Sequence, residues 1–169
     1  MSVLGEDSGP PPGAGHTAPL HSLDLTDAQR HLIQKLRQDY HFFSEMSEGE
    51  IASFLRLCKQ TAYEKGQSIF RQGESARDFH LVISGEVAIT VRDREVTRLG
   101  PGRVFGEMSL LEKIPRTASA TAAEPTRVFT VPAAVMSAKT PLLAYKVLLS
   151  VAQQMSEKLR ESNAHILSS

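Results

Sequence analysis

The segment from Phe105 to Ala122 holds the residues whose types and spacing are best suited to chemistry. Gly106 can let the backbone approach a ligand closely, and Glu107 to Leu111 can form one helical turn whose free N–H groups face an anion. Arg116 follows nine residues after Glu107, and its planar guanidinium can grip two phosphate oxygens with charge-assisted hydrogen bonds. Glu107 would repel a phosphate placed against it, so its fitting partner is a neutral donor such as a ribose hydroxyl. The segment therefore predicts a site for a sugar phosphate.

The elements that precede this segment are predicted to be helical first. Thr26 with Gln29, and Ser47 with Glu50, each match a capping box placed ahead of apolar residues that recur at helical spacing. The two predicted helices run from Asp27 to Gln38 and from just after Ser47 to about Lys59.

From Tyr63 to Val131 the apolar period drops towards two, which predicts strands. Many short strands separated by glycine turns favour a small antiparallel barrel or jelly roll. The pair Asp93-Arg94 is predicted to form a hairpin tip. The clearest predicted strand runs are Phe79–Val91, Glu95–Leu99 and Arg127–Val131.

After Val131 the period becomes helical again, with a short segment from Ala133 to Ser137, a break at Thr140-Pro141 and a long helix over Leu142–Ile166. Apolar and small residues follow a three-and-four spacing in this helix, as two helices packed side by side require. Either the helix lies on its own barrel, or it pairs with a second copy in a homodimer. The predicted seam consists of Tyr145, Leu148, Ala152, Met155, Leu159, Ser162 and Ile166.

Composition bounds the class of protein. Of the 169 residues 41% are hydrophobic and 22% are charged, and 19 basic residues balance 19 acidic ones, so one globular domain is expected and no nucleic-acid or membrane-surface partner is indicated. Residues 1–22, rich in Pro and Gly, are predicted to form a disordered arm. With no basic start and no long apolar run, a cytoplasmic location is expected. The single cysteine, Cys58, is expected to pack in the core from a helix position.

The segment Phe105–Ala122 resembles the phosphate-binding cassette of the cyclic nucleotide-binding domain family, whose pattern is Phe-Gly-Glu, a short spacer and then Pro-Arg-x-Ala. Lys65–Glu74 and Phe79–Val87 are similar to earlier strands of that family. The resemblance implies a mainly β fold with flanking helices, an antiparallel β-roll or jelly-roll barrel with N-terminal helices and a long C-terminal lid helix. The expected single domain covers 23–169, with helices over 26–60, the β-roll over 61–131 and C-terminal helices over 132–166.

Carried over residue by residue, the resemblance makes Glu107 the acceptor for the ribose 2′-hydroxyl and Arg116 the partner of the cyclic phosphate. The family pattern places backbone N–H groups of Gly106 and Ala118 against the phosphate. Alignment of the C-terminal helix with bacterial catabolite activator proteins puts Ser162 and Asn163 near an adenine amino group, which either side chain can bind. The expected ligand-binding residues are Gly106, Glu107, Met108, Ser109, Arg116, Thr117, Ala118, Ser162 and Asn163.

The function implied is that of a cytoplasmic sensor that binds cAMP and signals to a separate effector protein by moving its C-terminal helix. Thr117 can reach a purine edge without deciding the base, so cGMP and a cyclic dinucleotide stay open as ligands. The sequence also allows a ligand-free scaffold or a regulatory subunit that acts through protein contacts. No catalytic residue, cofactor or metal site is expected, since the six histidines lack metal-ligand spacing, and His80 is expected to be structural. Only Ala164–Ser169 follow the expected lid, so no DNA-reading element is expected.

Overall fold

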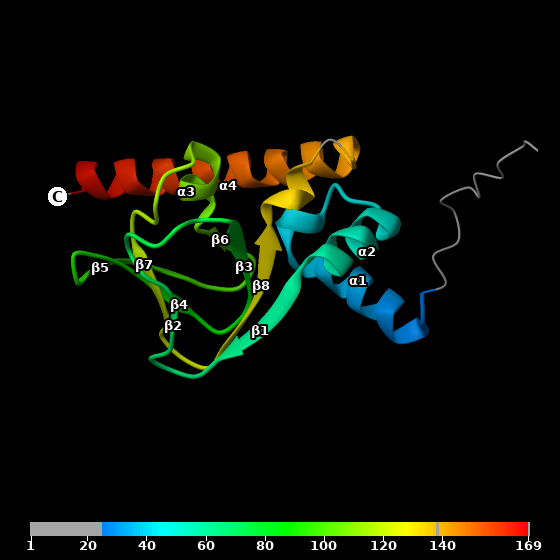
Figure 1. Ribbon diagram of the computed structural model, residues 1–169, viewed down its shortest axis with the longest axis horizontal. Helices are drawn as coiled ribbons and strands as arrows, with labels where there is room; N and C mark the ends of the chain where they lie inside the picture. The colour runs from blue at the N-terminus through cyan, green and yellow to red at the C-terminus, as the bar shows by residue number, and fades with distance from the viewer. Residues whose placement is uncertain (1–24, 138, 169) are drawn as a thin grey trace, which may run out of the picture.

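A computed structural model of the protein describes residues 25–137 and 139–168. Two four-stranded antiparallel sheets lie beside an N-terminal group of helices, and one long C-terminal helix crosses over both (Figure 1). The prediction of a mainly β fold with flanking helices is confirmed. The predicted disordered arm, residues 1–22, lies outside the described residues.

Capping boxes open both N-terminal helices, as predicted. Thr26 and Gln29 cap α1 (Asp27–Asp39), and Ser47 and Glu50 cap α2 (Glu48–Leu57), with a 3-10 turn, η1 (His41–Phe43), between them.

The predicted end of α2 near Lys59 is wrong. The helix ends at Leu57, with Cys58 as its C-cap, and Lys59 pairs with Thr130 as the first residue of a strand. Cys58 is half-buried, and burial raises the pKa of its thiol to about 12. A thiol with that pKa stays protonated at neutral pH and packs as a small apolar group.

The strands form two sheets that together make the predicted β-roll. The predicted run Phe79–Val91 is two strands, because Gly85 turns the chain between them with φ +85°. The first sheet contains, in order, β1 (Lys59–Tyr63), β8 (Thr126–Pro132), β3 (Asp78–Ser84) and β6 (Val104–Phe105). The second contains β2 (Ser68–Phe70), β7 (Ser119–Ala122), β4 (Val87–Val91) and β5 (Arg94–Leu99).

Alternation along the strands divides the core in two, because neighbouring side chains of a strand point to opposite faces of the sheet. On one face of the first sheet, Phe79, Leu81 and Val131 pack against the helices. On the other face, Val82 and Val128 meet side chains of the second sheet. The helices and the roll therefore share one sheet as a common wall.

The hairpin between β4 and β5 turns at Arg92-Asp93, one residue earlier than the predicted Asp93-Arg94. Arg92 and Asp93 have φ of +50° and +62°. Two successive positive φ values give the turn whose twist matches that of the flanking strands, even without glycine.

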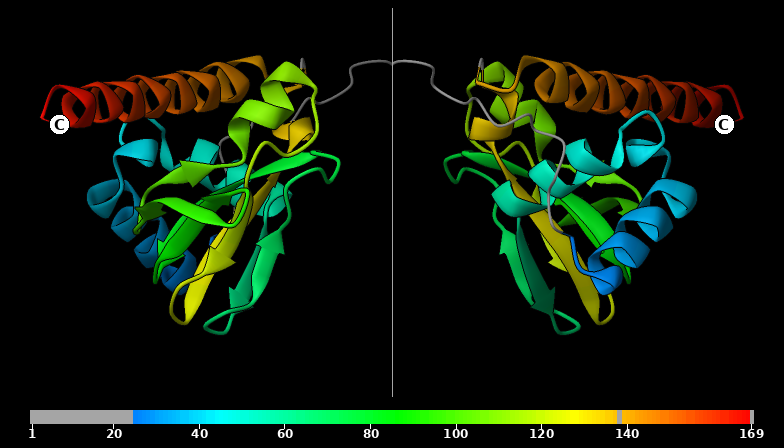
Figure 2. Two further views of the ribbon diagram at one scale, coloured as in Figure 1. Left: turned by 90° about the vertical axis from the view of Figure 1, so that its left-hand side faces the viewer. Right: turned by 90° about the vertical axis from the view of Figure 1, so that its right-hand side faces the viewer.

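The long C-terminal helix α4 (Pro141–Leu167) follows a 3-10 turn, η2 (Ala133–Met136), and crosses over both the N-terminal helices and the roll (Figures 1 and 2). It packs on its own domain, but not through the predicted seam: Tyr145, Leu159 and Ile166 are 61%, 63% and 70% exposed. The buried stripe includes polar Ser150 and Gln154, which a search for apolar spacing misses. Its members are Leu143, Ala144, Val147, Ser150, Val151 and Gln154. In the described part of the chain, no helix combines the length and the apolar character needed to cross a membrane.

Gly85 and Gly66 offer a matched test of backbone constraint. Both have φ near +85° to +88°, but a Cβ at Gly85 would lie 2.4 Å from the carbonyl oxygen of Pro125, whereas nothing lies within 4 Å at Gly66. Gly66→Ala should cost only the left-handed strain of about 1 kcal/mol, and Gly85→Ala about 2 kcal/mol more. Urea unfolding of both variants measures the difference. Equal losses would show that the turn at Gly85 relaxes freely.

Candidate functional site

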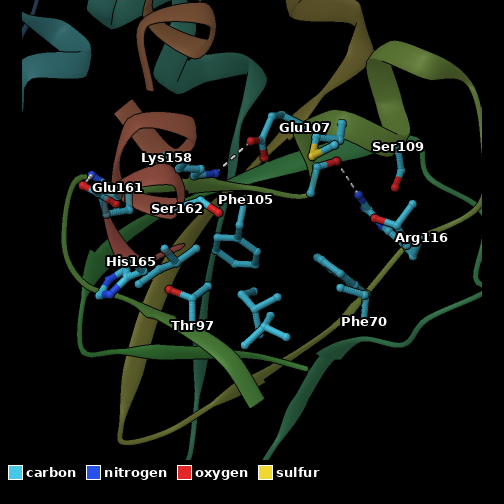
Figure 3. Close-up of a pocket in the computed structure, with 18 residues that line it drawn as sticks. Phe70, Thr97, Phe105, Glu107, Ser109, Arg116, Lys158, Glu161, Ser162 and His165 are labelled. Atoms are coloured by element: carbon cyan, nitrogen blue, oxygen red, sulfur yellow. Dashed lines mark hydrogen bonds and ion pairs between the residues drawn. The ribbon is translucent and has the colours of Figure 1, made fainter. Parts of the chain in front are cut away.

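One cavity of about 600 Å³ opens between the roll, the cassette helix α3 (Glu107–Glu112) and the last third of α4 (Figure 3). This volume is typical of sites for small organic ligands. Its lining residues are Phe70, Ile89, Val96, Thr97, Leu99, Arg103, Phe105, Gly106, Glu107, Met108, Ser109, Arg116, Thr117, Ala118, Lys158, Glu161, Ser162 and His165.

Arg116 is the buried cation of this cavity, with 4% of its surface exposed. Its Nη1 donates to the carbonyl oxygen of Gly106 at 2.7 Å, and its Nη2 donates to Oδ1 of Asp78 at 2.7 Å. The guanidinium carbon lies 4.2 Å from the centroid of the Phe70 ring. Nε is the one buried side-chain nitrogen or oxygen among the described residues that has no hydrogen-bond partner. The Nε–H of Arg116 is therefore left for an acceptor that the described residues do not supply.

The main-chain N–H and the main-chain carbonyl of Arg116 are both hydrogen-bonded to neighbouring backbone. Its N–H donates to the carbonyl oxygen of Glu74, and its carbonyl accepts from the N–H of Gly73, both at 2.8 Å. Gly106 leaves room for the side chain, because a Cβ at Gly106 would lie 2.6 Å from Nη1 of Arg116, and its φ is +77°. The glycine of the cassette is thus required both by its conformation and by the arginine beside it.

Glu107 is the buried carboxylate of the cavity, with its side chain 5% exposed. Its Oε1 accepts from Nζ of Lys158 at 2.8 Å (Figure 3). The same ammonium donates to the carbonyl oxygen of Val104. Because Lys158 comes from α4, an ion pair joins the cassette to the C-terminal helix across the cavity.

Two further contacts hold α4 against the segment 102–104. The Gln154 amide accepts from the N–H of Val104 and donates to the carbonyl oxygen of Gly102, both at 2.8 Å. Arg103 pairs with Glu161 at 3.1 Å and with Glu157 at 3.7 Å. The segment that leads into the cassette is therefore bound to α4 by backbone and by charge.

His80 packs against the rings of Phe70 and Phe105, which line the cavity, with its own ring centroid 5.5 and 5.1 Å from theirs. Burial, and after it the charge of Arg116, lowers the pKa of His80 to about 3. The ring is therefore neutral at physiological pH, and it shares a hydrogen bond with the Thr130 hydroxyl at 3.2 Å. This setting is that of a core residue, as predicted for His80.

The predicted site residues come together with one exception. Eight of the nine line the cavity, with Ser162 on α4 facing the cassette residues (Figure 3). Asn163, the ninth, is exposed and does not line the cavity, because it is one position further round the helix than Ser162. The expectation that Asn163 lies near the ligand stays a prediction, which the cavity lining does not support.

Sequence reasoning missed Lys158, Asp78 and Phe70. Lys158 lies four residues before Ser162, so helical spacing from a suspected site residue could have found it. Asp78 and Phe70 come from separate strands, and nothing in their local sequence links them to Arg116. Among the described residues, no group of three or more His, Cys, Asp or Glu side chains could hold a metal ion.

Known proteins are similar to this chain in sequence and in fold. Residues 60–139 match the sequence model of the family described as the cyclic nucleotide-binding domain. The chain is 32% identical over 132 residues to the cyclic AMP receptor protein of Thermus thermophilus, an alignment that covers 73% of this chain and 59% of that protein.

A second curated relative and a solved structure are similar to the chain in the same way. A cAMP-dependent protein kinase regulatory subunit of Yarrowia lipolytica is 29% identical over 124 residues, with 73% of this chain and 33% of that protein covered. The chain thus spans less than two thirds of either curated relative. The crystal structure of a cyclic nucleotide-binding domain from Methylobacillus flagellatus has the same fold, with a TM-score of 0.72 at 24% identity over 83% of this chain and 85% of that one.

His80 should limit stability in acid. Because its pKa is about 3 in the folded protein and 6.5 ordinarily, the unfolded chain binds a proton below pH 6.5 that the folded protein does not. The contribution of neutral His80 to the free energy of unfolding is complete above pH 6.5 and is lost as the pH falls towards 3. About 2 kcal/mol of unfolding free energy should therefore be lost between pH 7 and 5. Urea unfolding at both pH values should show this loss in the natural chain and in His31→Gln, an exposed control, but not in His80→Gln. A loss that persists in His80→Gln would assign it to other groups.

Proposed function

Because residues 60–139 match the model of the cyclic nucleotide-binding domain family, we propose that this chain is a cAMP receptor that signals to a separate protein and catalyses no reaction itself. The observation that carries the proposal is the buried Arg116, whose Nε lacks a partner, on the wall of a cavity shared with Glu107. A buried donor without an acceptor is costly, and a cyclic phosphate would satisfy it. The cytoplasmic location stays a prediction.

The division of the ligand follows from the chemistry of the two charged residues. Arg116 supplies the positive charge for the phosphate, and Glu107 can accept a hydrogen bond from the ribose 2′-hydroxyl. Backbone N–H groups of Gly106 and Ala118, on small residues that line the cavity, are suited to close approach by phosphate oxygens. Ser109 and Met108 line the same wall and complete the cassette side of the site.

The base is assigned to the α4 side of the cavity. Ser162 of α4 and Thr117 of the cassette segment both line the cavity, and their hydroxyls can accept from the adenine amino group. The names of two relatives, a cyclic AMP receptor protein and a cAMP-dependent kinase subunit, support cAMP. Both hydroxyls can also donate, so cGMP is the second candidate, and a cyclic dinucleotide the third.

We propose α4 as the part that carries the signal. Near its beginning Lys146 pairs with Glu50 of α2 at 2.7 Å, and Ser150 donates to the carbonyl oxygen of Phe42 at 3.0 Å. Its last third lines the cavity. A ligand that changes the fit of that end would therefore change the packing of the N-terminal helices, shifting a balance between two arrangements. An effector protein that reads this change is the expected partner, and a ligand-free scaffold or a constitutive regulatory subunit is the alternative.

Calorimetric titration with cAMP and with cGMP tests the ligand. We expect cAMP to bind more tightly, and failure of both to bind more tightly than about 100 μM would refute the receptor. A bound ligand should also raise the melting temperature, which a ligand-free scaffold would not show.

Arg116→Ala should cost at least about 2 kcal/mol of binding free energy, because the phosphate loses its counter-charge. Arg127→Ala, which removes an exposed arginine on β8, is the control and should bind normally.

The exposed seam of α4 supports a homodimer, because large apolar side chains on one helix leave uncovered area that a second copy could bury. We expect the chain to sediment at twice the mass of one copy. Leu159→Glu, at a 63% exposed position on α4, should give monomers, whereas Leu32→Glu, at a 45% exposed position on α1, should not. A natural chain that sediments as a monomer at high concentration would exclude this dimer.

A further inference from the structure

A second cavity, of about 410 Å³, shares Arg116 and Phe70 with the first, so the buried guanidinium borders both spaces. Its other walls come from β1, β2, β3 and β8 and from the loop that follows β2. Unlike a void in an apolar core, this cavity is lined by hydroxyls and charged groups. Polar side chains on its sheet wall include Thr61 and Tyr63 of β1, Asp78 and His80 of β3, and Thr130 of β8.

The hydroxyls of β1 reach the second cavity by strand alternation. Thr61 and Tyr63 are two positions apart on β1, so their side chains point to the same face of the first sheet. Burial, and after it the negative charge of Asp78, raises the pKa of Tyr63. The phenol therefore stays protonated, and two hydroxyl oxygens share the cavity with one carboxylate.

Asp78 brings a negative charge to this cavity with one oxygen open. Its Oδ1 accepts from Nη2 of Arg116 at 2.7 Å and lies 3.4 Å from Nε2 of His80. Among the described residues no hydrogen bond or ion pair reaches its Oδ2, and the side chain is 33% exposed. The open oxygen is therefore placed to accept from a ligand in the second cavity.

The charges around Asp78 favour a cationic donor once the first cavity holds a phosphate. Arg116 then faces two anions, the phosphate and Asp78, and one positive charge cannot offset both. His80 adds no charge because its ring is neutral. Lys59 and Glu74, which also line the second cavity, are exposed and opposite in sign. Negative charge on Asp78 is therefore left for a cation.

The donor set of the second cavity suits an ammonium group. Among the described residues no group of His, Cys, Asp or Glu side chains could hold a metal ion. One carboxylate oxygen with neighbouring hydroxyls instead matches an ammonium, which donates several hydrogen bonds from one centre. Hydrogen bonds between a charged donor and a carboxylate are also the stronger kind.

We propose that the second cavity binds a small primary amine, whose ammonium donates to Oδ2 of Asp78 and to the hydroxyls of Tyr63 and Thr61. A phosphate on Arg116 leaves more of the charge of Asp78 for the amine. By thermodynamic reciprocity, the bound amine strengthens phosphate binding by the same factor. This coupling rests on the proposed function, whereas the amine site itself does not.

Titration of the full chain with n-butylamine, followed by NMR of the backbone amides, tests the site. We expect butylamine to shift the amides around Asp78 with a dissociation constant of about 5 mM, a usual affinity for so small a ligand. The uncharged n-butanol, which has nearly the same size, should bind at least about tenfold more weakly.

Two variants locate the bound amine. Tyr63→Phe and Thr61→Val each remove one hydroxyl with little change in volume, and each should weaken butylamine binding about fivefold. Tyr145→Phe is the matched control, because it removes the hydroxyl of a 61% exposed tyrosine on α4, and it should leave binding unchanged. Butanol that binds as tightly as butylamine, or butylamine affinity that is unchanged in both Tyr63→Phe and Thr61→Val, would overturn the amine site.

Repeating the butylamine titration with saturating cAMP tests the coupling. Bound cAMP should tighten butylamine binding about fivefold, within the range usual for coupled sites. Equal affinity with and without bound cAMP would overturn the coupling. A chain that binds butylamine but no cAMP would overturn the receptor and the coupling together, and would support the amine site alone.

Discussion

The burial of the Arg116 guanidinium is the constraint on which the arrangement of the site depends. A cation that is 4% exposed must be compensated by charge and by hydrogen bonds. Asp78 of β3 and the carbonyl oxygen of Gly106 provide that compensation, and the Phe70 ring of β2 covers one face. Each partner comes from a different element, so the two sheets and the cassette must be assembled before the arginine can be buried.

A second charged residue, Glu107, places the C-terminal helix under the same kind of constraint. Its carboxylate is buried beside α4 and is balanced by Lys158 from that helix. The contacts of Gln154 with the backbone at Gly102 and Val104 fix the helix along the segment that enters the cassette. Glu107 is therefore both a group suited to a ligand and a group that docks the helix, which is the physical basis of the proposed signalling through α4.

Local sequence patterns predicted the elements well where they depend on near neighbours. Capping boxes at Thr26 and Ser47 marked two helix starts, since the cap and its partner lie within one turn. The pattern erred where a distant partner decides the conformation: Lys59 is a strand residue because β8 pairs with it. The packed face of α4 was missed for a similar reason, because Ser150 and Gln154 are polar and are buried by hydrogen bonds to distant backbone groups.

By itself the sequence determined the cassette, because Gly106, Glu107 and Arg116 lie within one short segment whose spacing is visible along the chain. Only the tertiary structure decided what balances their charges. Asp78 is 38 residues from Arg116, and Lys158 is 51 residues from Glu107. Pairs so far apart are brought together by strand order and helix docking, which no local periodicity encodes. The sequence thus specifies the charged groups of the cassette, and the fold specifies which charges allow them to be buried.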